Sequence, residues 1–293
     1  MGESQIFQID SIDANSFYEE FGFAHFRSSS SSFISVIDKC FRYYSSAKKN
    51  NSSKNIAFRS ADGRPKHIID IFRDKNSDSF KIYSSNVVKT LIKKNVSPNE
   101  RFIFTHSKMS FKQVQSDSIW QPHQDNGYKT QGDIREGFAI FICLEDMNEE
   151  NGCLQVWPGS NKLGLLPHSR IIEDKKTGDN QFYVEDVPNN ITPKSIIAKK
   201  GDIIIFSSNT IHHSLSSKST SNRLSLIAEI ECFNSLKLDD YGKVPIFSIG
   251  SIRLFEKIML LLKIMYSPYF YWRIIKKNRV LAMLIRKLRY SFN

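Results

Sequence analysis

The sequence predicts a mainly β protein, an antiparallel sandwich or jelly roll with flanking helices. From Arg101 onward, short apolar runs of strand length alternate with Gly, Pro and Asn turns. These runs follow one another without the regularly spaced helices that a parallel α/β sheet needs. The chain has 293 residues and is 40% hydrophobic, so it can bury a substantial core.

The first hundred residues predict helices. Residues 15–21 predict a short helix that ends at Gly22, because glycine is the usual terminator of a helix. Residues 33–44, after a serine run, and residues 87–94 repeat apolar side chains at helical spacing. We interpret these helices as braces on the outside of a sheet, without chemistry of their own.

The strand predictions occupy the rest of the chain up to residue 231. The runs are residues 101–105, 109–114, 137–144, 153–157, 196–198, 203–206 and 224–231. The first two runs predict either two strands or one bent strand. Residues 183–195 predict an ordered loop between strands.

The net charge of +11 is concentrated at the end of the sequence. Residues 251–293 hold ten basic residues and one acidic residue, so the other 250 residues carry only +2. The body of the protein therefore has no charge signature of a nucleic-acid binder, and we expect no nucleic-acid partner.

Residues 251–293 predict a basic amphipathic helical tail, separate from a domain of residues 1–250. Charged residues and Ser267-Pro268 interrupt its apolar runs, so none reaches the roughly 18 residues of a transmembrane helix. Two short helices can pack on the barrel or on a second subunit, and the oligomeric state stays open. Alternatively they lie on anionic lipid as a peripheral membrane contact, with a lipid-linked substrate.

The four cysteines show no spacing typical of a zinc site or a disulfide framework. Residues 1–11 contain acidic residues and lack the apolar core of a signal peptide. We therefore expect a cytoplasmic protein, with a peripheral position at the inner face of the membrane as the alternative.

A metal site is predicted by three side chains. His123 and Asp125 stand two residues apart, so in an extended segment they point to the same side. His212 follows the apolar run 202–206 and offers a third ligand, and alternation directs His213 to the other face. Two histidines and one carboxylate form the ligand set of non-heme Fe(II) oxygenases.

Further motifs accompany these ligands in a fixed order. They are Asn151-Gly152, Pro158-Gly159-Ser160, Gly201-Asp202, Ser214 and Arg223. With the His-x-Asp pair and residues 17–23, they make residues 11–232 resemble the phytanoyl-CoA dioxygenase family of Fe(II)/2-oxoglutarate enzymes. The resemblance implies a double-stranded β-helix, which is a cupin-like jelly roll, with the helical segment of residues 1–100 packed on one sheet.

The resemblance also implies the reaction. Fe(II), 2-oxoglutarate and O2 are the expected cofactors, and succinate and CO2 the expected co-products of hydroxylation of a small molecule. Related halogenases replace the metal-binding carboxylate with a small residue, whereas Asp125 is present here. Hydroxylation is therefore favoured over halogenation.

The far carboxylate of 2-oxoglutarate requires a cation, and a planar guanidinium binds a carboxylate through two hydrogen bonds. Arg223, eleven residues after His212, fits this role. Ser214 can donate a second hydrogen bond. We also assign Lys108, Lys112 and Phe141 to the co-substrate pocket.

Residues that flank the metal motif are candidates for substrate binding: Trp120, Gln124, Asn126, Tyr128 and Lys129. Their spacing identifies no particular substrate. A second class of function is a catalytically inactive jelly roll that binds a small ligand or a membrane surface. The presence of His123, Asp125, His212 and Arg223 together favours the enzyme.

Overall fold

The structure is a computed structural model that describes residues 5–47, 57–59, 65–69, 78–95, 102–112, 114–115, 119–129, 137–174 and 179–232. The predicted tail of residues 251–293, and the domain boundary before it, lie outside the described residues. Within those residues, no helix has both the length and the apolar character needed to cross a membrane.

The largest sheet has eight strands, and we call it the major sheet. Its strands in spatial order are β1 (Ile6–Gln8), β2 (Phe23–Arg27), β12 (Ile203–Ser207), β7 (Gly137–Cys143), β14 (Arg223–Cys232), β5 (Phe102–Lys112), β4 (Pro65–Ile69) and β3 (Ala57–Arg59). All neighbours are antiparallel except β1 and β2.

A four-stranded sheet, here the minor sheet, completes the barrel. Its order is β11 (Lys194–Ser195), β8 (Leu154–Val156), β13 (His212–Ser214) and β6 (Trp120–His123). A separate hairpin pairs β9 (His168–Asp174) with β10 (Asp179–Val184). Strands distant in sequence are neighbours in both sheets, which is the connectivity of a jelly roll and confirms the predicted fold class.

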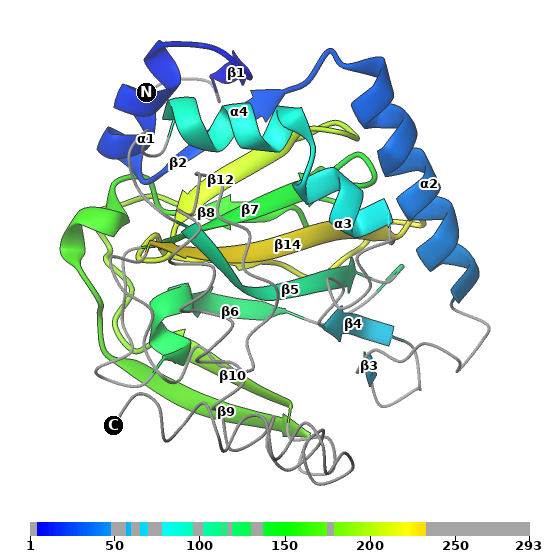
Figure 1. Ribbon diagram of the computed structural model, residues 1–293. Helices are drawn as coiled ribbons and strands as arrows, with labels where there is room; N and C mark the ends of the chain where they lie inside the picture. The colour runs from blue at the N-terminus through cyan, green and yellow to red at the C-terminus, as the bar shows by residue number, and fades with distance from the viewer. Residues whose placement is uncertain are drawn as a thin grey trace, which may run out of the picture. The chain divides into compact units, whose positions relative to one another are not determined.

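Within the described residues, four α-helices accompany the sheets: α1 (Asp13–Phe21), α2 (Ser31–Ala47), α3 (Asp78–Tyr83) and α4 (Asn86–Asn95). Figure 1 shows α3 and α4 lying over the centre of the major sheet. Helix α1 begins before the predicted start and has no side-chain cap at Ile12. It ends as predicted at Gly22, whose φ of 76° is left-handed and whose added Cβ would lie 2.5 Å from Thr210 Oγ1.

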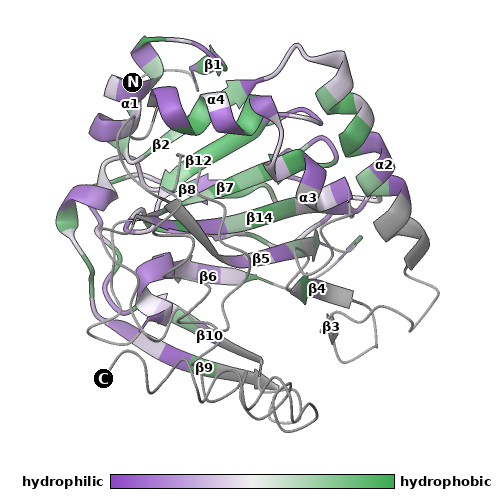
Figure 2. Ribbon diagram, viewed as in Figure 1, coloured by the Kyte–Doolittle hydropathy of each residue, from purple (hydrophilic) through white to green (hydrophobic). Residues whose placement is uncertain are grey.

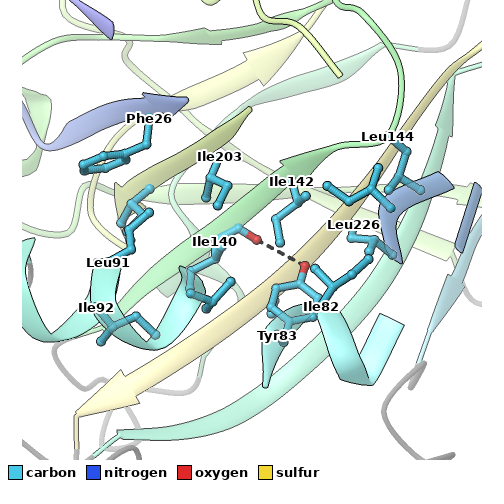
Figure 3. Packing of buried hydrophobic residues seen from close by; sticks show 14 of the residues in the cluster. Phe26, Ile82, Tyr83, Leu91, Ile92, Ile140, Ile142, Leu144, Ile203 and Leu226 are labelled. Carbon is cyan, nitrogen blue, oxygen red and sulfur yellow. Dashed lines mark hydrogen bonds between the residues drawn. The ribbon is translucent and has the colours of Figure 1, made fainter. Parts of the chain in front are cut away.

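Alternation along β7 divides the core into two layers. Ile140 and Ile142 face the helices, and Phe141 and Cys143 face the minor sheet. Figure 3 shows side chains of α3 and α4 packed on the first layer, where Tyr83 donates a hydrogen bond to the carbonyl of Ile140 at 3.4 Å. Figure 2 shows apolar residues concentrated on β7 and β12, in the middle of the major sheet. The layer between the sheets holds the site.

The structure differs from the sequence predictions at several strands. The two runs before residue 115 form the single strand β5. Strands β1 to β4 lie in the region predicted to be helical, and the β9–β10 hairpin was not predicted. These strands are short or rich in polar residues, and β2 forms by pairing with β12, some 180 residues later. Local periodicity does not reveal such pairing.

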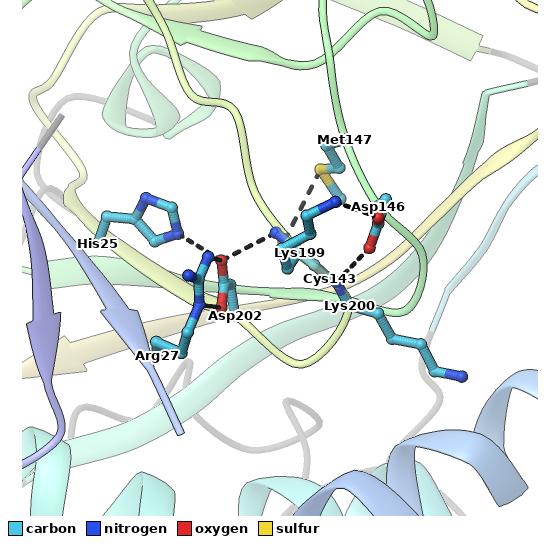
Figure 4. Close-up of polar contacts among 8 residues, drawn as sticks. All are labelled: His25, Arg27, Cys143, Asp146, Met147, Lys199, Lys200 and Asp202. Atoms are coloured by element: carbon cyan, nitrogen blue, oxygen red, sulfur yellow. Dashed lines mark hydrogen bonds and ion pairs between the residues drawn. The ribbon is translucent and has the colours of Figure 1, made fainter. Parts of the chain in front are cut away.

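Asp202, from the Gly-Asp motif, joins β2 to the start of β12. The residue is buried, and its carboxylate accepts hydrogen bonds from His25 Nε2 at 3.0 Å, from Arg27 at 2.7 and 2.8 Å, and from the Lys199 amide at 2.8 Å. Figure 4 shows these donors around it. Burial alone raises the pKa of Asp202, but the hydrogen bonds from Arg27 and His25 outweigh it and lower the pKa to about 2.

Candidate metal centre and co-substrate pocket

His123 and His212 lie directly opposite each other on neighbouring strands of the minor sheet. His123 is the last residue of β6, and His212 is the first residue of β13. Asp125 opens the 3-10 helix η2 (Asp125–Tyr128) two residues later. One ligand atom from each of the three lies within 4.8 Å of the others, and Asp125 Oδ1 is 3.6 Å from His212 Nε2 and 4.0 Å from His123 Nε2.

Backbone carbonyls orient both imidazoles. His123 Nδ1 donates to the carbonyl of Gln121 at 2.6 Å, and His212 Nδ1 donates to that of Thr210 at 3.0 Å. These bonds place the proton on Nδ1 and direct both Nε2 lone pairs towards Asp125. Burial lowers the pKa of His123 well below its ordinary value and that of His212 to about 4. Both rings are therefore neutral at pH 7, as metal coordination requires.

The donor set fits a divalent cation. Asp125 is 6% exposed, and its Oδ2 has no hydrogen-bond partner among the residues that the structure describes. A buried carboxylate oxygen without a partner is costly unless a cation compensates it. His123, His212 and Asp125 would hold such an ion on one face, as two histidines and one carboxylate hold non-heme iron.

Gln124, between the first two ligands, fixes the loop rather than facing the cavity. Its Nε2 donates to the carbonyls of Gly164 at 2.7 Å and Asn209 at 2.6 Å, and its Oε1 accepts from the Leu166 amide at 2.8 Å. The backbone amide of Gln124 donates to Nε2 of His168 at 3.1 Å. Its side chain is fully buried and its amide groups are used in these bonds.

Ser160, from the Pro-Gly-Ser motif, positions the chain before His212. Its hydroxyl donates to the carbonyl of Trp157 at 2.7 Å and accepts from the amide of Ile211 at 2.9 Å. Thr210 Oγ1 donates to the carbonyl of Gly22 at 2.7 Å. The turn motif thus contributes to the site by holding a ligand-bearing segment.

A cavity opens beside the three ligands. Its lining combines metal ligands, cations and apolar side chains: Lys108, Ser110, Trp120, His123, Asp125, Phe141, Leu154, Phe206, His212, His213, Ser214, Arg223 and Ile227. The structure therefore brings the predicted residues Lys108, Trp120, Phe141, Ser214 and Arg223 to one cavity with the triad.

Arg223 is a buried cation with hydrogen-bonding capacity to spare. It is 2% exposed, its Nη1 donates to the carbonyl of Gly152, and its Nε has no partner within the described residues. Its guanidinium carbon lies 5.9 Å from the ring centre of Phe141. Burial lowers the pKa of Arg223 to about 10, so it stays charged at neutral pH. Ser214 Oγ is also buried without a partner in the described chain. Both orphaned donors fit a carboxylate.

Five other predicted residues lie outside the cavity lining, and one of them, Lys129, forms an ion pair with Glu231 at 2.7 Å. Lys112 is buried and pairs in register with Arg223. Asn126 is buried and donates to Asn209 Oδ1 at 2.7 Å, and Gln124 is held as described above. Tyr128 is 40% exposed, with its ring edge-on to His123 at 5.5 Å between centres.

His213 faces away from the metal ligands, as alternation predicts, yet it also borders the cavity. Its Nε2 bonds Gln155 Oε1 at 2.5 Å, Gln155 Nε2 donates to Ser195 Oγ at 2.8 Å, and Ser195 donates to Glu149 at 2.7 Å. Burial and then the charge of Lys112 lower the pKa of His213 to about 4. Sequence reasoning missed this chain, because its members come from separate segments.

The sequence matches the phytanoyl-CoA dioxygenase (PhyH) family over residues 33–225. A phytanoyl-CoA dioxygenase of Arabidopsis thaliana is 31% identical over 126 residues, which is 42% of each chain. A phytanoyl-CoA dioxygenase domain-containing protein 1 of Danio rerio is 25% identical over 41% of this chain and 42% of that protein. The matched segments thus span less than half of these relatives.

Solved structures share the fold. AviO1 from Streptomyces viridochromogenes Tue57 has a TM-score of 0.56 at 17% identity, over 82% of this chain and 99% of its own. EvdO2 from Micromonospora carbonacea var. aurantiaca, complexed with 2-oxoglutarate, has a TM-score of 0.57 at 15% identity, over 75% of this chain and 90% of its own. With two thirds of its length matched by one family, this chain belongs to the phytanoyl-CoA dioxygenase family.

Proposed function

We propose that the protein is a non-heme Fe(II)- and 2-oxoglutarate-dependent oxygenase that hydroxylates a small molecule. One observation carries this proposal: three buried ligands with neutral histidines share a cavity with a buried arginine that has an unused donor. Family membership supports it, because the family is named for a dioxygenase. In EvdO2, the same fold is complexed with 2-oxoglutarate.

The protein's own groups have distinct tasks in this proposal. His123, Asp125 and His212 hold the iron, and Arg223 with Ser214 binds the far carboxylate of 2-oxoglutarate against Phe141. When bound, iron, O2 and 2-oxoglutarate together supply an oxidant able to attack a C–H bond, and the co-substrate leaves as succinate and CO2. The apolar lining excludes water and positions the bond to be attacked. Asp125 stands where related halogenases have a small residue, which favours hydroxylation over halogenation.

The test measures both binding and turnover. The full-length protein should bind one Fe(II) anaerobically, then 2-oxoglutarate, and form succinate in air, slowly in the absence of the substrate. Asp125→Ala should lose all three, and Asp186→Ala, an exposed aspartate away from the site, should lose none. A wild-type protein that binds neither metal nor 2-oxoglutarate would instead support the inactive ligand-binding jelly roll.

The predicted lipid-linked substrate and the peripheral membrane contact of residues 251–293 form a separate component of the proposal. They rest on the basic and aromatic composition of that segment. The intact protein should sediment with vesicles containing phosphatidylserine at low salt. Removal of residues 251–293 should abolish this binding, and vesicle binding that survives the truncation would refute it.

A further inference from the structure

The cavity has two cationic ends. On β5, Lys108, Ser110 and Lys112 face the barrel interior, while Met109 and Phe111 pack in the layer under the helices. Lys112 is in register with Arg223, and Lys108 is in register with Ile227. Lys108 therefore lies four residues, about 13 Å along the strand, from the level of the co-substrate cation.

Within the described chain, Lys108 has no hydrogen bond and no ion pair with another side chain. Its Nζ lies 5.3 Å from the ring centre of Trp120 in a cation–π contact, and its charge also acts on His123, His212 and Glu229. The Trp120 ring is itself 6.3 Å from the His123 ring and 5.8 Å from the His67 ring. Trp120 thus holds the ammonium beside the metal ligands with its hydrogen-bond donors unused.

The acidic residues nearby on β14 do not pair with Lys108. Glu231 forms an ion pair with Lys129 at 2.7 Å. Glu229 is half-buried, and burial followed by the negative charge of Asp125 raises the pKa of its carboxyl, whereas His106 and the charge of Lys108 act to lower it. Within the described residues, no ion pair joins Lys108 to either glutamate.

The cavity lining holds two basic side chains besides its histidines, Lys108 and Arg223, and one acidic side chain, Asp125. Asp125 belongs to the candidate metal site and Arg223 to the proposed co-substrate pocket. Lys108 is the remaining charged side chain of this lining, which also contains the apolar side chains of Trp120, Phe141, Leu154, Phe206 and Ile227.

We propose that Lys108 binds an anionic group of the substrate, and that the substrate is therefore an organic anion with an apolar body. This inference rests on the proposed function and names the substrate class for it. It separates Lys108 from the co-substrate pocket, to which the sequence pattern had assigned it. The carboxylate that Lys108 binds could instead belong to 2-oxoglutarate, so the test measures the affinity for the probe and the affinity for 2-oxoglutarate.

The probes are phenylacetate and phenylacetamide, which have nearly the same shape and differ in charge. Each is titrated by calorimetry into the full-length protein loaded with Zn(II), a redox-inert substitute for iron, and saturated with 2-oxoglutarate so that Arg223 is occupied. The wild type should prefer phenylacetate by about tenfold or more, as expected for one charge-assisted hydrogen bond.

Three variants test the role of Lys108. Lys108→Met should lose the preference while its affinity for 2-oxoglutarate stays within about twofold. Lys108→Arg should keep the preference, which excludes misfolding as the cause of the loss, and Lys94→Met, on the exposed face of α4, should behave as wild type. A wild type without the preference overturns the inference. So does a Lys108→Met variant whose main loss is in 2-oxoglutarate affinity, because Lys108 would then serve the co-substrate.

Failure of the proposed function has a different signature. A Zn(II)-loaded wild type that does not bind 2-oxoglutarate in a separate titration overturns the oxygenase proposal, and this inference with it. Normal 2-oxoglutarate binding without discrimination between the two probes overturns only the assignment of Lys108.

Discussion

The carbonyl of Gly152 accepts a hydrogen bond from Nη1 of Arg223, so the Asn151-Gly152 turn orients the cation of the proposed co-substrate pocket. Asn151 secures the turn, because it exchanges hydrogen bonds with Asn148 at 2.9 and 3.0 Å. A short motif of two residues thereby connects a surface turn to the buried site.

Gly152→Ala should weaken both stability and co-substrate binding. The residue has a φ of +70°, and an added Cβ would lie 2.5 Å from the carbonyl oxygen of Leu215. We expect a loss of about 1–3 kcal/mol in the free energy of unfolding and a raised KM for 2-oxoglutarate. Gly159→Ala is the matched control, because Gly159 has a φ of +80° but no atom closer than 3.9 Å. Equal effects in the two variants would show that backbone strain alone is responsible.

Arg223→Lys should lower the affinity for 2-oxoglutarate by about tenfold or more, because an ammonium cannot bind a carboxylate through two parallel bonds or stack on Phe141. The affinity for Fe(II) should change little, since Arg223 is not a ligand. Anaerobic titrations of metal and of 2-oxoglutarate measure the two effects separately. An unchanged affinity for 2-oxoglutarate would remove Arg223 from the co-substrate pocket.

Gln124→Leu should loosen the metal loop. It removes three side-chain hydrogen bonds and leaves half-buried backbone groups of Gly164, Leu166 and Asn209 without these partners. A loss of about 2–4 kcal/mol in unfolding free energy is expected, with weaker metal binding in the fraction that folds. Gln8→Leu, at an exposed position on β1, should change neither quantity. Substrate affinity that falls while stability and metal affinity are kept would instead return Gln124 to the substrate pocket.

The metal-free protein should become less stable as the pH falls from about 6.5 towards about 4. Burial lowers the pKa of His212 from 6.5 to about 4, and that of His213 likewise, so in this window the unfolded state binds more protons than the folded state. One such shift corresponds to roughly 3 kcal/mol. Urea unfolding at pH 7 and at pH 5 measures this loss of stability, and His212→Asn should make the stability depend less on pH. Stability that rises on acidification would contradict neutral buried histidines.

The sequence alone predicted those features of the site that depend on positions close together in the chain. The two-residue alternation at His123 and Asp125, and again at His212 and Ser214, places the paired side chains on one side of an extended segment. The structure brings all four into one cavity. The end of α1 at Gly22 was predictable for the same reason.

Contacts between segments that are distant in sequence could not be predicted from neighbouring positions. Gln124 looked free to meet a substrate, but its partners are backbone groups 40 to 85 residues later in the chain. Lys108 and Lys112 share a strand face, yet only Lys108 lines the cavity. Lys112 lies opposite Arg223 on β14 and Lys108 lies opposite Ile227, so the two lysines have different neighbours. This register depends on strand pairing across the barrel.

Strand β6 is the edge of the minor sheet, and it pairs with β13 only through His123 with His212 and Trp120 with Ser214, across an irregular register. An ion held by both histidines would join these strands by bonds that bypass the backbone ladder. At a concentration one hundred times its dissociation constant, such an ion stabilises the folded chain by about 2.7 kcal/mol. Loss of iron should therefore quicken amide deuterium uptake first along β6, so that metal starvation would expose this edge to proteases before the rest of the barrel.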